Sequence, residues 1–356
     1  MNIAVDCRML HASGVGAFLR GILPWLLKSP HHFLLIGDKV KINSFLPDNN
    51  VQIIDCSINA FSINELFFFP KKTVNQINHE DVFFSPFFNF PGGITIPVYT
   101  TIHDIIFPDM PKLVSKTGLA ARMFFFRRAY KKSVKIFTVS KFSKSRIEYH
   151  LGKTKPVVVA NSGIQPSFPE YRANVQNVQK KRTIIFIGNI KKHKGLDYLL
   201  DAFIIAKKEG LQHKLIIVGS MENFRTSDNS VIKKIDAAGP DAVSFTGFIS
   251  DEQLMKYLCE ASLLVQPSLY EGFGLPPLEA MVLGTHVLIS DIPVFREIYA
   301  DYPVTFFQAG NTLDLKNKMT ELLQKENIEP LVLSKELTEK YNFKKTASIV
   351  LKEMAF

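Results

Sequence analysis

Short apolar runs alternate with longer helix-like stretches along the chain, and this alternation limits the possible fold more than any other feature of the sequence. In the first half, strands are predicted at 3–6, 33–36, 51–54, 82–84, 98–102, 136–139 and 157–159, and helices at 17–27, 62–69, 118–132 and 143–150. Apolar strands separated by crossover helices are typical of a parallel sheet covered on both faces. The first half is therefore predicted to be an α/β domain.

The same pattern begins again after a polar segment, 171–181, for which no regular structure is predicted. Strands are expected at 183–187, 214–218, 242–245, 263–266, 286–290 and 304–306, and helices at 196–209, 231–238, 251–260, 277–283, 293–299 and 312–325. A chain of 356 residues is long enough for two domains that each bury a core. We therefore predict two doubly wound α/β domains, 1–165 and 166–341, followed by a helical segment at 342–356.

The composition excludes several classes of protein. Hydrophobic residues make up 46% of the chain, yet no apolar run is long enough to cross a bilayer. The first residues resemble a strand rather than a secretion signal. The three cysteines, Cys7, Cys56 and Cys259, match no metal site or disulfide framework. We therefore expect a cytoplasmic protein.

The net charge of +10 arises entirely in the first domain. Residues 1–165 contain 20 Lys and Arg against 10 Asp and Glu, whereas residues 166–356 contain 23 of each. Between Asp109 and Glu148 there is no acidic residue, and basic residues are interleaved with the aromatic run at 123–126. This segment could contact anionic lipid, bind nucleic acid, or be a solvated face whose phenylalanines lie in the core. We favour an anionic membrane surface, because each basic residue near it contributes about 1 kcal/mol. No nucleic-acid-binding module accompanies the charge.

Two carboxylates flank a glycine turn in the segment 268–280, which follows the apolar run 261–266. Two prolines suit the first turn of a helix there, which would place Glu279 in that turn, eight residues after Glu271. Free N–H groups at a helix start bind anions, and Gly274, Leu275 and Leu278 are the predicted donors. The carboxylates would repel phosphate, so we expect them to accept hydrogen bonds from sugar or ribose hydroxyls. The alternative is an ordinary capped helix.

This segment resembles the paired-glutamate signature of retaining glycosyltransferases with the GT-B fold, specifically family 4. The segments 101–104 and 186–195 make the chain most similar to bacterial mannosyltransferases of O-antigen and capsule synthesis. The resemblance implies two Rossmann-like domains facing a cleft, with the helix at 342–356 packed back on the N-terminal domain. It also implies that Glu271 faces the donor sugar, that Glu279 holds the ribose, and that neither a metal ion nor a cofactor is needed.

His103 and the pair Gly14 and Gly16 are further candidates in the first domain. His103 follows a predicted strand at its carboxyl end, where open α/β sheets place ligand-binding residues. The resemblance implies that it contacts the donor sugar, where it would position the sugar or share in proton handling. The glycines form a turn before a helix, which any α/β protein could contain, but the resemblance places this loop beside the donor. They are not a full dinucleotide fingerprint, so redox chemistry is disfavoured.

A lysine-rich loop follows the predicted strand 183–187. The family commonly places an arginine after the glycine of this strand and a lysine before the next helix, and this chain has Asn189 and Lys194 at those positions. Lys194 is therefore the candidate that neutralises the departing diphosphate, and Lys191 or Lys192 would replace the arginine. A solvated charge run is the alternative.

Three further strand-end residues are predicted to surround the nucleotide. Gly188 ends the strand before the lysine loop, and Gly219 ends the next one. Phe248 could stack on the base, although an aromatic residue at a strand end is more often part of the core.

Together with these features, the resemblance implies a retaining glycosyltransferase that moves a sugar from a nucleotide-sugar donor to a lipid-linked or oligosaccharide acceptor at the inner face of the cytoplasmic membrane. On the resemblance alone, GDP-mannose is the first choice of donor, before other GDP-sugars and UDP-sugars. Domain 1–165 would bind the acceptor and domain 166–341 the donor. The rivals are a non-hydrolysing nucleotide-sugar epimerase and a non-catalytic sugar-binding protein of the same fold. Glu271, Glu279 and Lys194 argue against the binding protein, and Asn189 is the one point in its favour.

Overall fold

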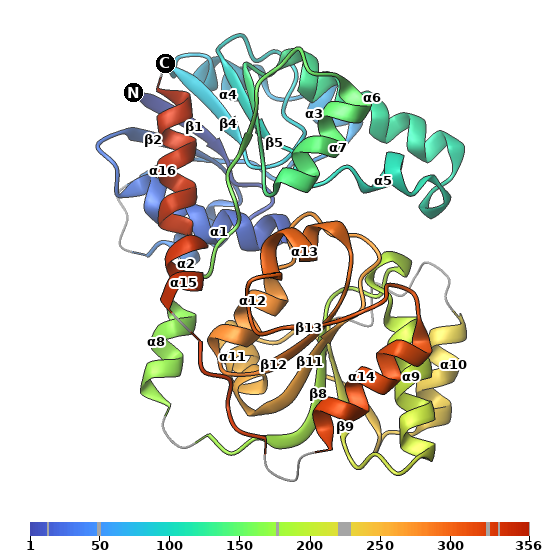
Figure 1. The fold of residues 1–356 in the computed structure, drawn as a ribbon. Helices are drawn as coiled ribbons and strands as arrows, with labels where there is room; N and C mark the ends of the chain where they lie inside the picture. Colours follow the sequence, from blue (N-terminus) through green and yellow to red (C-terminus); the bar gives the residue numbers. More distant parts are fainter. Residues whose placement is uncertain are drawn as a thin grey trace. The chain divides into compact units, whose positions relative to one another are not determined.

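The chain forms two compact units, each built around a parallel β-sheet (Figure 1). The computed structural model describes residues 1–12, 14–47, 51–175, 178–219, 229–324, 328–333 and 335–355. The N-terminal unit comprises Met1–Gly163 and Tyr341–Phe356, and the C-terminal unit comprises Ile164–Lys340.

The N-terminal unit has a seven-stranded sheet in the order β3-β2-β1-β4-β5-β6-β7. All of its strand pairs are parallel. The strands are β1 Asn2–Asp6, β2 His32–Gly37, β3 Gln52–Asp55, β4 Val82–Ser85, β5 Val98–Thr101, β6 Lys135–Thr138 and β7 Val157–Val159. Most of their side chains are buried, as expected for a parallel sheet that helices cover on both faces.

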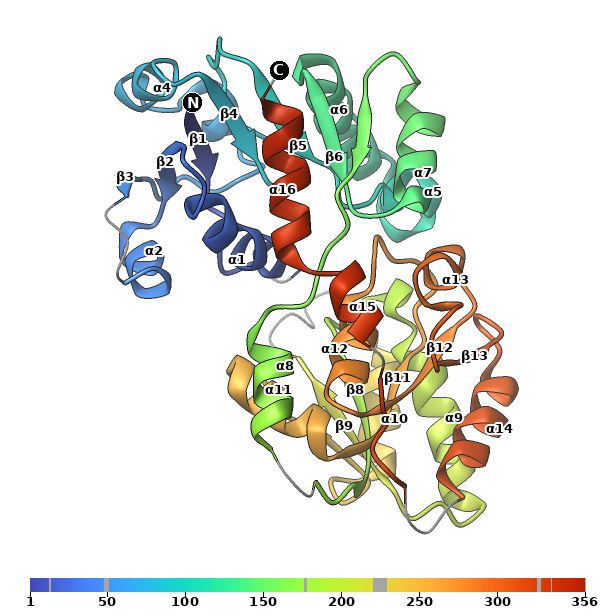
Figure 2. The same ribbon diagram turned by 60° about the vertical axis from the view of Figure 1, so that its left-hand side comes forward.

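Helices cover this sheet, and the last helix of the chain is one of them (Figures 1 and 2). They are α1 Gly14–Leu27, α2 Lys39–Phe45, α3 Ile63–Phe67, α4 Lys71–Ile77, α5 Ile106–Asp109, α6 Lys116–Lys132, α7 Lys141–Leu151 and α16 Phe343–Met354, with a 3₁₀ turn η1 at Pro111–Leu113. The Phe343 ring of α16 lies 6.0 Å from the Phe18 ring of α1. A Cβ atom on Gly21 would meet the Phe343 ring at 2.2 Å, so α16 packs closely on α1.

The C-terminal unit has a six-stranded sheet in the order β10-β9-β8-β11-β12-β13, whose strand pairs are also parallel. The strands are β8 Lys181–Ile187, β9 Lys214–Val218, β10 Val243–Phe245, β11 Ala261–Gln266, β12 His286–Ser290 and β13 Thr305–Phe307. The helices are α8 Ser167–Asn174, α9 Leu196–Lys208, α10 Asn229–Ala238, α11 Asp251–Glu260, α12 Leu275–Val282, α13 Pro293–Tyr299, α14 Thr312–Leu323 and α15 Lys335–Lys340, with a 3₁₀ turn η2 at Lys192–Lys194.

Several sequence predictions of local structure are wrong. Helix α1 begins at Gly14, so Gly14 and Gly16 lie in its first turn and not in a preceding loop. The segment 171–181 is irregular only in part, because α8 extends to Asn174 and β8 begins at Lys181. Helices α2 and α4 were not predicted, because each is only 7 residues long and too short to show a helical period.

A buried network of charged side chains, which we call the Arg8 network, lies at the carboxyl ends of β1 and β4. Arg8 forms ion pairs with Asp6 at 2.6 Å and with Glu65 at 2.5 Å, and all three side chains are at most 3% exposed. Asn89 donates to Glu65, and Arg128 donates to Asn89. The chain runs to opposite sides of the sheet from β1 and β4, so the network occupies the topological switch point of this sheet.

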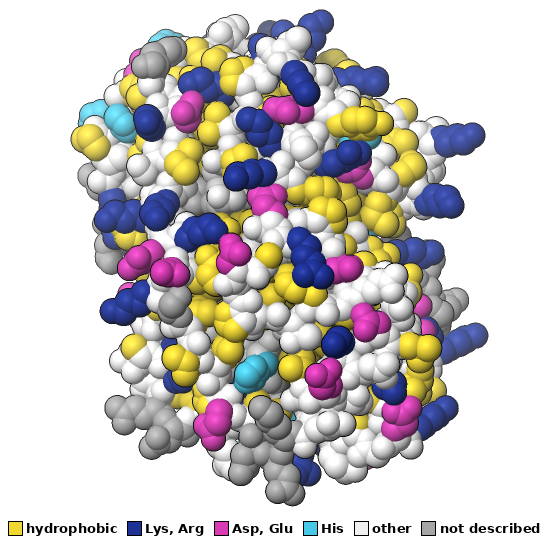
Figure 3. Space-filling model, viewed as in Figure 1, with side chains coloured by type: hydrophobic (Ala, Val, Ile, Leu, Met, Phe, Trp, Pro, Cys, Tyr) yellow, Lys and Arg dark blue, Asp and Glu magenta, His cyan; other side chains and the backbone are white. Residues whose placement is uncertain are grey.

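The basic segment around α6 is only partly a solvated face. Phe126 is buried, but Phe124 is 54% exposed. Arg128 belongs to the Arg8 network, and Arg146 pairs with Asp109 at 2.5 Å. Figure 3 shows Lys and Arg side chains projecting near α5 and α6 beside exposed hydrophobic ones. In the described part of the chain, no helix combines the length and apolar character that membrane crossing requires.

Candidate functional site

The carboxyl ends of β8 and β11 bring together two of the predicted site loops. These strands are neighbours in the sheet, and the chain leaves them toward opposite edges, to β9 and to β12. Ligands of open α/β sheets bind at such a switch point, outside the carboxyl ends of the strands. The loop 188–195 follows β8 and the loop 267–274 follows β11.

An ion pair joins the two loops. Lys194 Nζ lies 2.8 Å from both Oε1 and Oε2 of Glu271, although the residues are 77 positions apart. Ser268 Oγ donates to Glu271 Oε1 at 2.7 Å. The side chains of Lys194 and Glu271 are 23% and 10% exposed, so little solvent screens the pair. Burial alone would raise the pKa of Glu271, but the Lys194 ammonium and the Ser268 hydroxyl outweigh it and lower that pKa. Glu271 is therefore a carboxylate at neutral pH.

The position of Lys194 depends on the glycine that follows it. Gly195 has φ +70°, which favours glycine, and a Cβ atom there would lie 1.9 Å from the Pro267 carbonyl oxygen. The Leu269 N–H donates to the His193 carbonyl at 2.7 Å. Contacts on both sides of Lys194 thus hold the loop 188–195 against the loop 267–274.

We expect the substitution Gly195→Ala to separate the two loops. A methyl group cannot fit against the Pro267 carbonyl, and alanine is strained at this φ. The free energy of unfolding should fall by about 1–3 kcal/mol, and any ligand that needs Lys194 beside Glu271 should bind at least tenfold more weakly. Urea denaturation and nucleotide titration measure the two effects. Gly210→Ala is the matched control, because Gly210 also has positive φ but has open space around its Cβ position. Equal nucleotide binding by both variants would contradict this role of Gly195.

Helix α12 begins beside this ion pair, and its start differs from the sequence prediction. Gly274 precedes the helix with φ +90°, and a Cβ atom there would lie 2.4 Å from the Phe295 ring. Because the helix starts at Leu275, Glu279 is its fifth residue and lies beyond the first turn, contrary to prediction. Leu278 is the fourth residue of the helix, so its N–H belongs to the first four, which need no intrahelical partner. Gly274, Leu275 and Leu278 therefore all stay predicted donors.

The other predicted donor-binding residues also lie in loops after strands of this sheet. Gly188 and Asn189 follow β8, and Lys191 is exposed in the same loop. Gly219 follows β9 and pairs with Gly247 in an isolated bridge. Phe248 is 93% exposed, so its interpretation as a core residue is wrong. Ser220, the residue after Gly219, lies outside the described residues.

His103 lies in the N-terminal unit, directly after β5 and next to α1. The His103 ring lies 4.9 Å from the ring of Phe18. Phe18 is two residues after Gly16 in α1. His103 Nε2 lies 2.8 Å from the Pro86 carbonyl oxygen. A carbonyl only accepts, so Nε2 carries the proton and Nδ1 is the acceptor atom of the ring. Burial lowers the pKa of His103 to about 4. His103 is therefore neutral at pH 7 and can accept, but not supply, a proton through Nδ1. Its neighbour Asp104 accepts from the Ile106 N–H at the start of α5.

The polar side chains that support Glu271 were not predicted from the sequence. Ser268 Oγ accepts from Gln266 Nε2 at 3.2 Å while it donates to Glu271. The Ser290 hydroxyl donates to the Ser268 carbonyl. These residues form a chain of hydrogen bonds that orients the carboxylate before any ligand binds. The signal was present in the sequence, since Gln266 ends the predicted strand and Ser268 opens the motif.

The C-terminal unit matches a known protein family. Residues 167–340 match the family model described as glycosyl transferases group 1. The chain is 26% identical over 255 residues to an uncharacterized glycosyltransferase, MJ1178, of Methanocaldococcus jannaschii, covering 71% of this chain and 66% of that protein. It is 32% identical over 208 residues to the O-antigen chain mannosyltransferase RfbU of Salmonella typhimurium, covering 56% of this chain and 53% of that protein. These matches thus span between half and two thirds of the relatives' lengths.

Solved structures match the whole chain. The Anabaena protein Alr3699/HepE, crystallised with UDP and glucose, superposes with a TM-score of 0.73 at 16% identity, covering 100% of this chain and 99% of that one. The predicted fold class is thus confirmed: the chain has two parallel-sheet α/β units that match GT-B glycosyltransferase structures, and its C-terminal unit matches the glycosyl transferases group 1 family.

Proposed function

We propose that the protein is a retaining glycosyltransferase that transfers a hexose from a nucleoside diphosphate sugar to a hydroxyl of a glycan acceptor. The observation that carries the proposal is the Lys194–Glu271 pair, set at a sheet switch point beside the start of α12. Such a site offers a cation and free N–H groups to a diphosphate, and a carboxylate to sugar hydroxyls. The match of residues 167–340 to glycosyl transferases group 1 supports it.

In the proposed reaction, the bond between the anomeric carbon and the diphosphate oxygen breaks, and a bond to the acceptor oxygen forms on the same face. The acceptor proton passes to the departing diphosphate. Lys194 and the N–H groups of Gly274 and Leu275 stabilise the charge that develops on the diphosphate. Glu271 accepts hydrogen bonds from the sugar, and Glu279 accepts from the ribose. His103 positions the sugar as a neutral hydrogen-bond acceptor.

The proposal extends to the roles of the units and to the donor. The C-terminal unit binds the donor, and the N-terminal unit binds the acceptor, a lipid-linked or oligosaccharide glycan of surface polysaccharide synthesis. Mannose from GDP-mannose is our first choice, supported by the relative named as an O-antigen chain mannosyltransferase. A UDP-sugar is the second choice, supported by the structure solved with UDP and glucose. Neither a metal ion nor a cofactor takes part.

Nucleotide binding tests the proposed donor site. At a hundred times its Kd, GDP or UDP should stabilise the protein by about 2.7 kcal/mol, whereas NAD should not. Excess EDTA should leave the shift unchanged. Glu279→Gln should weaken binding at least tenfold, while Glu252→Gln, at an exposed position of α11, should not. Thermal unfolding at matched nucleotide concentrations provides the measurement. A shift with NAD alone, or none with GDP and UDP, would falsify the proposed donor class.

We further propose that the N-terminal unit docks on the inner face of the cytoplasmic membrane. Ile63, Phe67 and Phe68 at α3 are 71%, 73% and 70% exposed. Phe61, two residues before α3, has its ring 5.9 Å from the ring of Phe125 in α6. The exposed apolar residues at α3 therefore adjoin the basic helix α6. Exposed aromatic residues beside clustered cations suit the surface of an anionic bilayer.

Vesicle flotation tests the membrane proposal. The double substitution Phe67→Ser and Phe68→Ser should reduce binding to vesicles rich in phosphatidylglycerol more than tenfold, since burying each ring contributes about 1.5 kcal/mol or more. Val332→Ser is the matched control, because Val332 is 90% exposed in the C-terminal unit. Equal flotation of the two variants would exclude α3 as the docking element, and flotation that high salt does not weaken would argue against the basic surface.

A further inference from the structure

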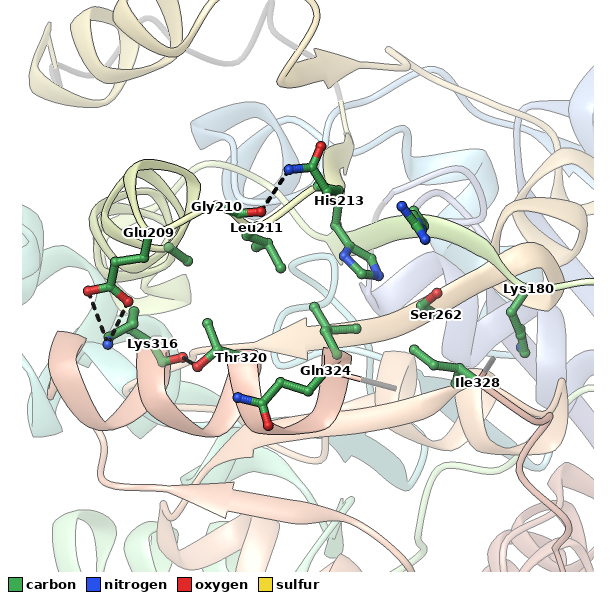
Figure 4. Close-up of a pocket in the computed structure, with 14 residues that line it drawn as sticks. Lys180, Glu209, Gly210, Leu211, His213, Ser262, Lys316, Thr320, Gln324 and Ile328 are labelled. Atoms are coloured by element: carbon green, nitrogen blue, oxygen red, sulfur yellow. Dashed lines mark hydrogen bonds and ion pairs between the residues drawn. The ribbon is translucent and has the colours of Figure 1, made fainter. Parts of the chain in front are cut away.

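The C-terminal unit contains a cavity at the amino ends of β8, β9 and β11, away from the loops 188–195 and 267–274 at the carboxyl ends of β8 and β11. It has a volume of about 510 Å³, within the usual range for small-molecule sites. Its lining includes Arg182 near the start of β8, His213 directly before β9, and Ser262 near the start of β11. Figure 4 shows the His213 ring pointing from the chain before β9 into this cavity, with α14 on the facing side.

His213 is an unusual buried histidine. It is only 5% exposed, and neither ring nitrogen has a hydrogen-bond partner among the described residues. A neutral imidazole carries one N–H, and leaving a buried donor unpaired is unfavourable. Burial, together with the nearby cations Arg182 and Lys207, lowers the pKa of His213 to about 4. The ring is thus a neutral, unpaired group held beside positive charge.

The charge around the cavity is predominantly positive. Lys180, Arg182 and Lys316 line it, against the single carboxylate of Glu209, which pairs with Lys316 at 3.0 Å. Lys180 Nζ donates to the Cys259 carbonyl and the Thr285 hydroxyl, which are neutral groups. Two of the three cations thus have no carboxylate against them among the described residues, which favours an anionic ligand.

Part of the remaining wall is apolar, beside the polar side chains of Gln212, Thr320 and Gln324. Leu211, Leu323 and Ile328 line the cavity together with Ala206. A ligand that is charged throughout would leave this surface without a partner, whereas one with an apolar part would cover it.

We propose that this cavity binds a small organic anion, a carboxylate or a phosphate monoester, whose charged group lies between Arg182 and His213 and whose apolar part lies against Leu211, Leu323 and Ile328. The His213 N–H donates to the anion, and the Arg182 guanidinium neutralises it. The site is separate from the proposed donor site, because the two lie at opposite ends of β8.

Phenyl phosphate is a suitable probe, with benzyl alcohol as its neutral counterpart. In the full chain labelled with ¹⁵N-histidine, phenyl phosphate should shift the ring resonances of His213 saturably, with a Kd below about 1 mM, and benzyl alcohol should not. His213→Phe identifies the resonances. Arg182→Gln should weaken binding at least tenfold, and Lys208→Gln, an exposed cation on α9, should leave it unchanged. Inorganic phosphate should bind more weakly than phenyl phosphate, because it leaves the apolar wall uncovered.

Three results would overturn the proposal. The absence of a saturable shift at millimolar phenyl phosphate would mean that the cavity holds only water. Equal affinity in Arg182→Gln and Lys208→Gln would mean general association with surface charge. A marked loss of thermal stability in His213→Phe would mean that the ring has a structural partner, since replacing an unpaired donor by an apolar ring should cost little. The measurement needs no sugar transfer, so it is independent of the proposed function.

Discussion

Replacing Lys194 with methionine should lower the free energy of unfolding of the C-terminal unit by about 3 kcal/mol at pH 7 and should nearly abolish turnover. The substitution leaves the Glu271 carboxylate, which is 10% exposed, without its cation. Breaking a buried ion pair at one partner is strongly destabilising, because the other charge stays buried. If the protein is the proposed transferase, losing the cation at the departing diphosphate should reduce kcat by roughly 100- to 1000-fold.

The pH dependence of the stability loss in Lys194→Met distinguishes a lost ion pair from a loss of side-chain packing. In the native protein the pKa of Glu271 is lowered, so its contribution to stability is present above its ordinary pKa and is lost as the pH falls through the lowered value. Without Lys194, burial should raise the pKa of Glu271 instead. The folded variant would then bind a proton more readily than the unfolded chain. The difference in free energy of unfolding between the wild type and Lys194→Met should therefore be smaller at pH 5 than at pH 7.

A double substitution tests the same pair without relying on one variant. Lys194→Met combined with Glu271→Gln removes both charges and should recover most of the lost stability, whereas turnover should stay low. Lys256→Met, at an exposed position of α11, is the control and should change neither. Urea denaturation followed by circular dichroism and single-turnover assays measure the two effects. Equal stability of Lys194→Met and the wild type at pH 7 would show that the pair does not form in solution.

The fold could be predicted from the sequence largely because its strands are short, apolar runs. The predicted strands 157–159, 214–218 and 286–290 have the observed limits, as does the predicted helix 251–260. The start of that helix is fixed by a capping box between Ser250 and Gln253. Helix α12 begins at Leu275, two residues before the predicted start at Pro277. The positive φ of Gly274 lets the helix start before both prolines. That shift moved Glu279 out of the first turn.

The site could be predicted only as separate strand ends. Lys194 and Glu271 each follow a predicted strand, but their contact depends on β8 and β11 being neighbours in the sheet. Neither spacing nor residue type specifies that order, because crossovers can place successive strands on either side. The same holds for the pairing of Arg8 with Glu65, which are 57 positions apart. Long-range partners are fixed by the topology and not by local sequence.

Replacing Arg8 with methionine should destabilise the N-terminal unit by about 4 kcal/mol at pH 7. Arg8 is the shared cation of two carboxylates, Asp6 and Glu65, and all three side chains are almost fully buried. Removing it would leave both carboxylates buried without their cation, which is among the costliest single changes in a protein. The rings of Phe69 and Phe87, which the guanidinium overlies, would lose their cation contacts as well.

The sole tryptophan allows this loss to be assigned to one unit. Trp25 lies in α1 of the N-terminal unit, so its fluorescence during urea denaturation follows that unit. Burial already raises the pKa of Glu65, and Arg8 opposes that rise. Without Arg8 the folded state should bind protons more readily than the unfolded chain, so the deficit should be larger at pH 7 than at pH 5.

Matched variants separate the buried charge from the loss of a long side chain. Arg8→Met with Glu65→Gln should recover part of the stability, because only Asp6 then remains charged. Arg127→Met, at an exposed position of α6, should stay within about 0.5 kcal/mol of the wild type. If Arg8→Met does not fold, the double variant should still fold at pH 5, where the remaining carboxylate is more easily protonated. A tryptophan unfolding midpoint that Arg8→Met leaves unchanged would show that the network contributes nothing to this unit.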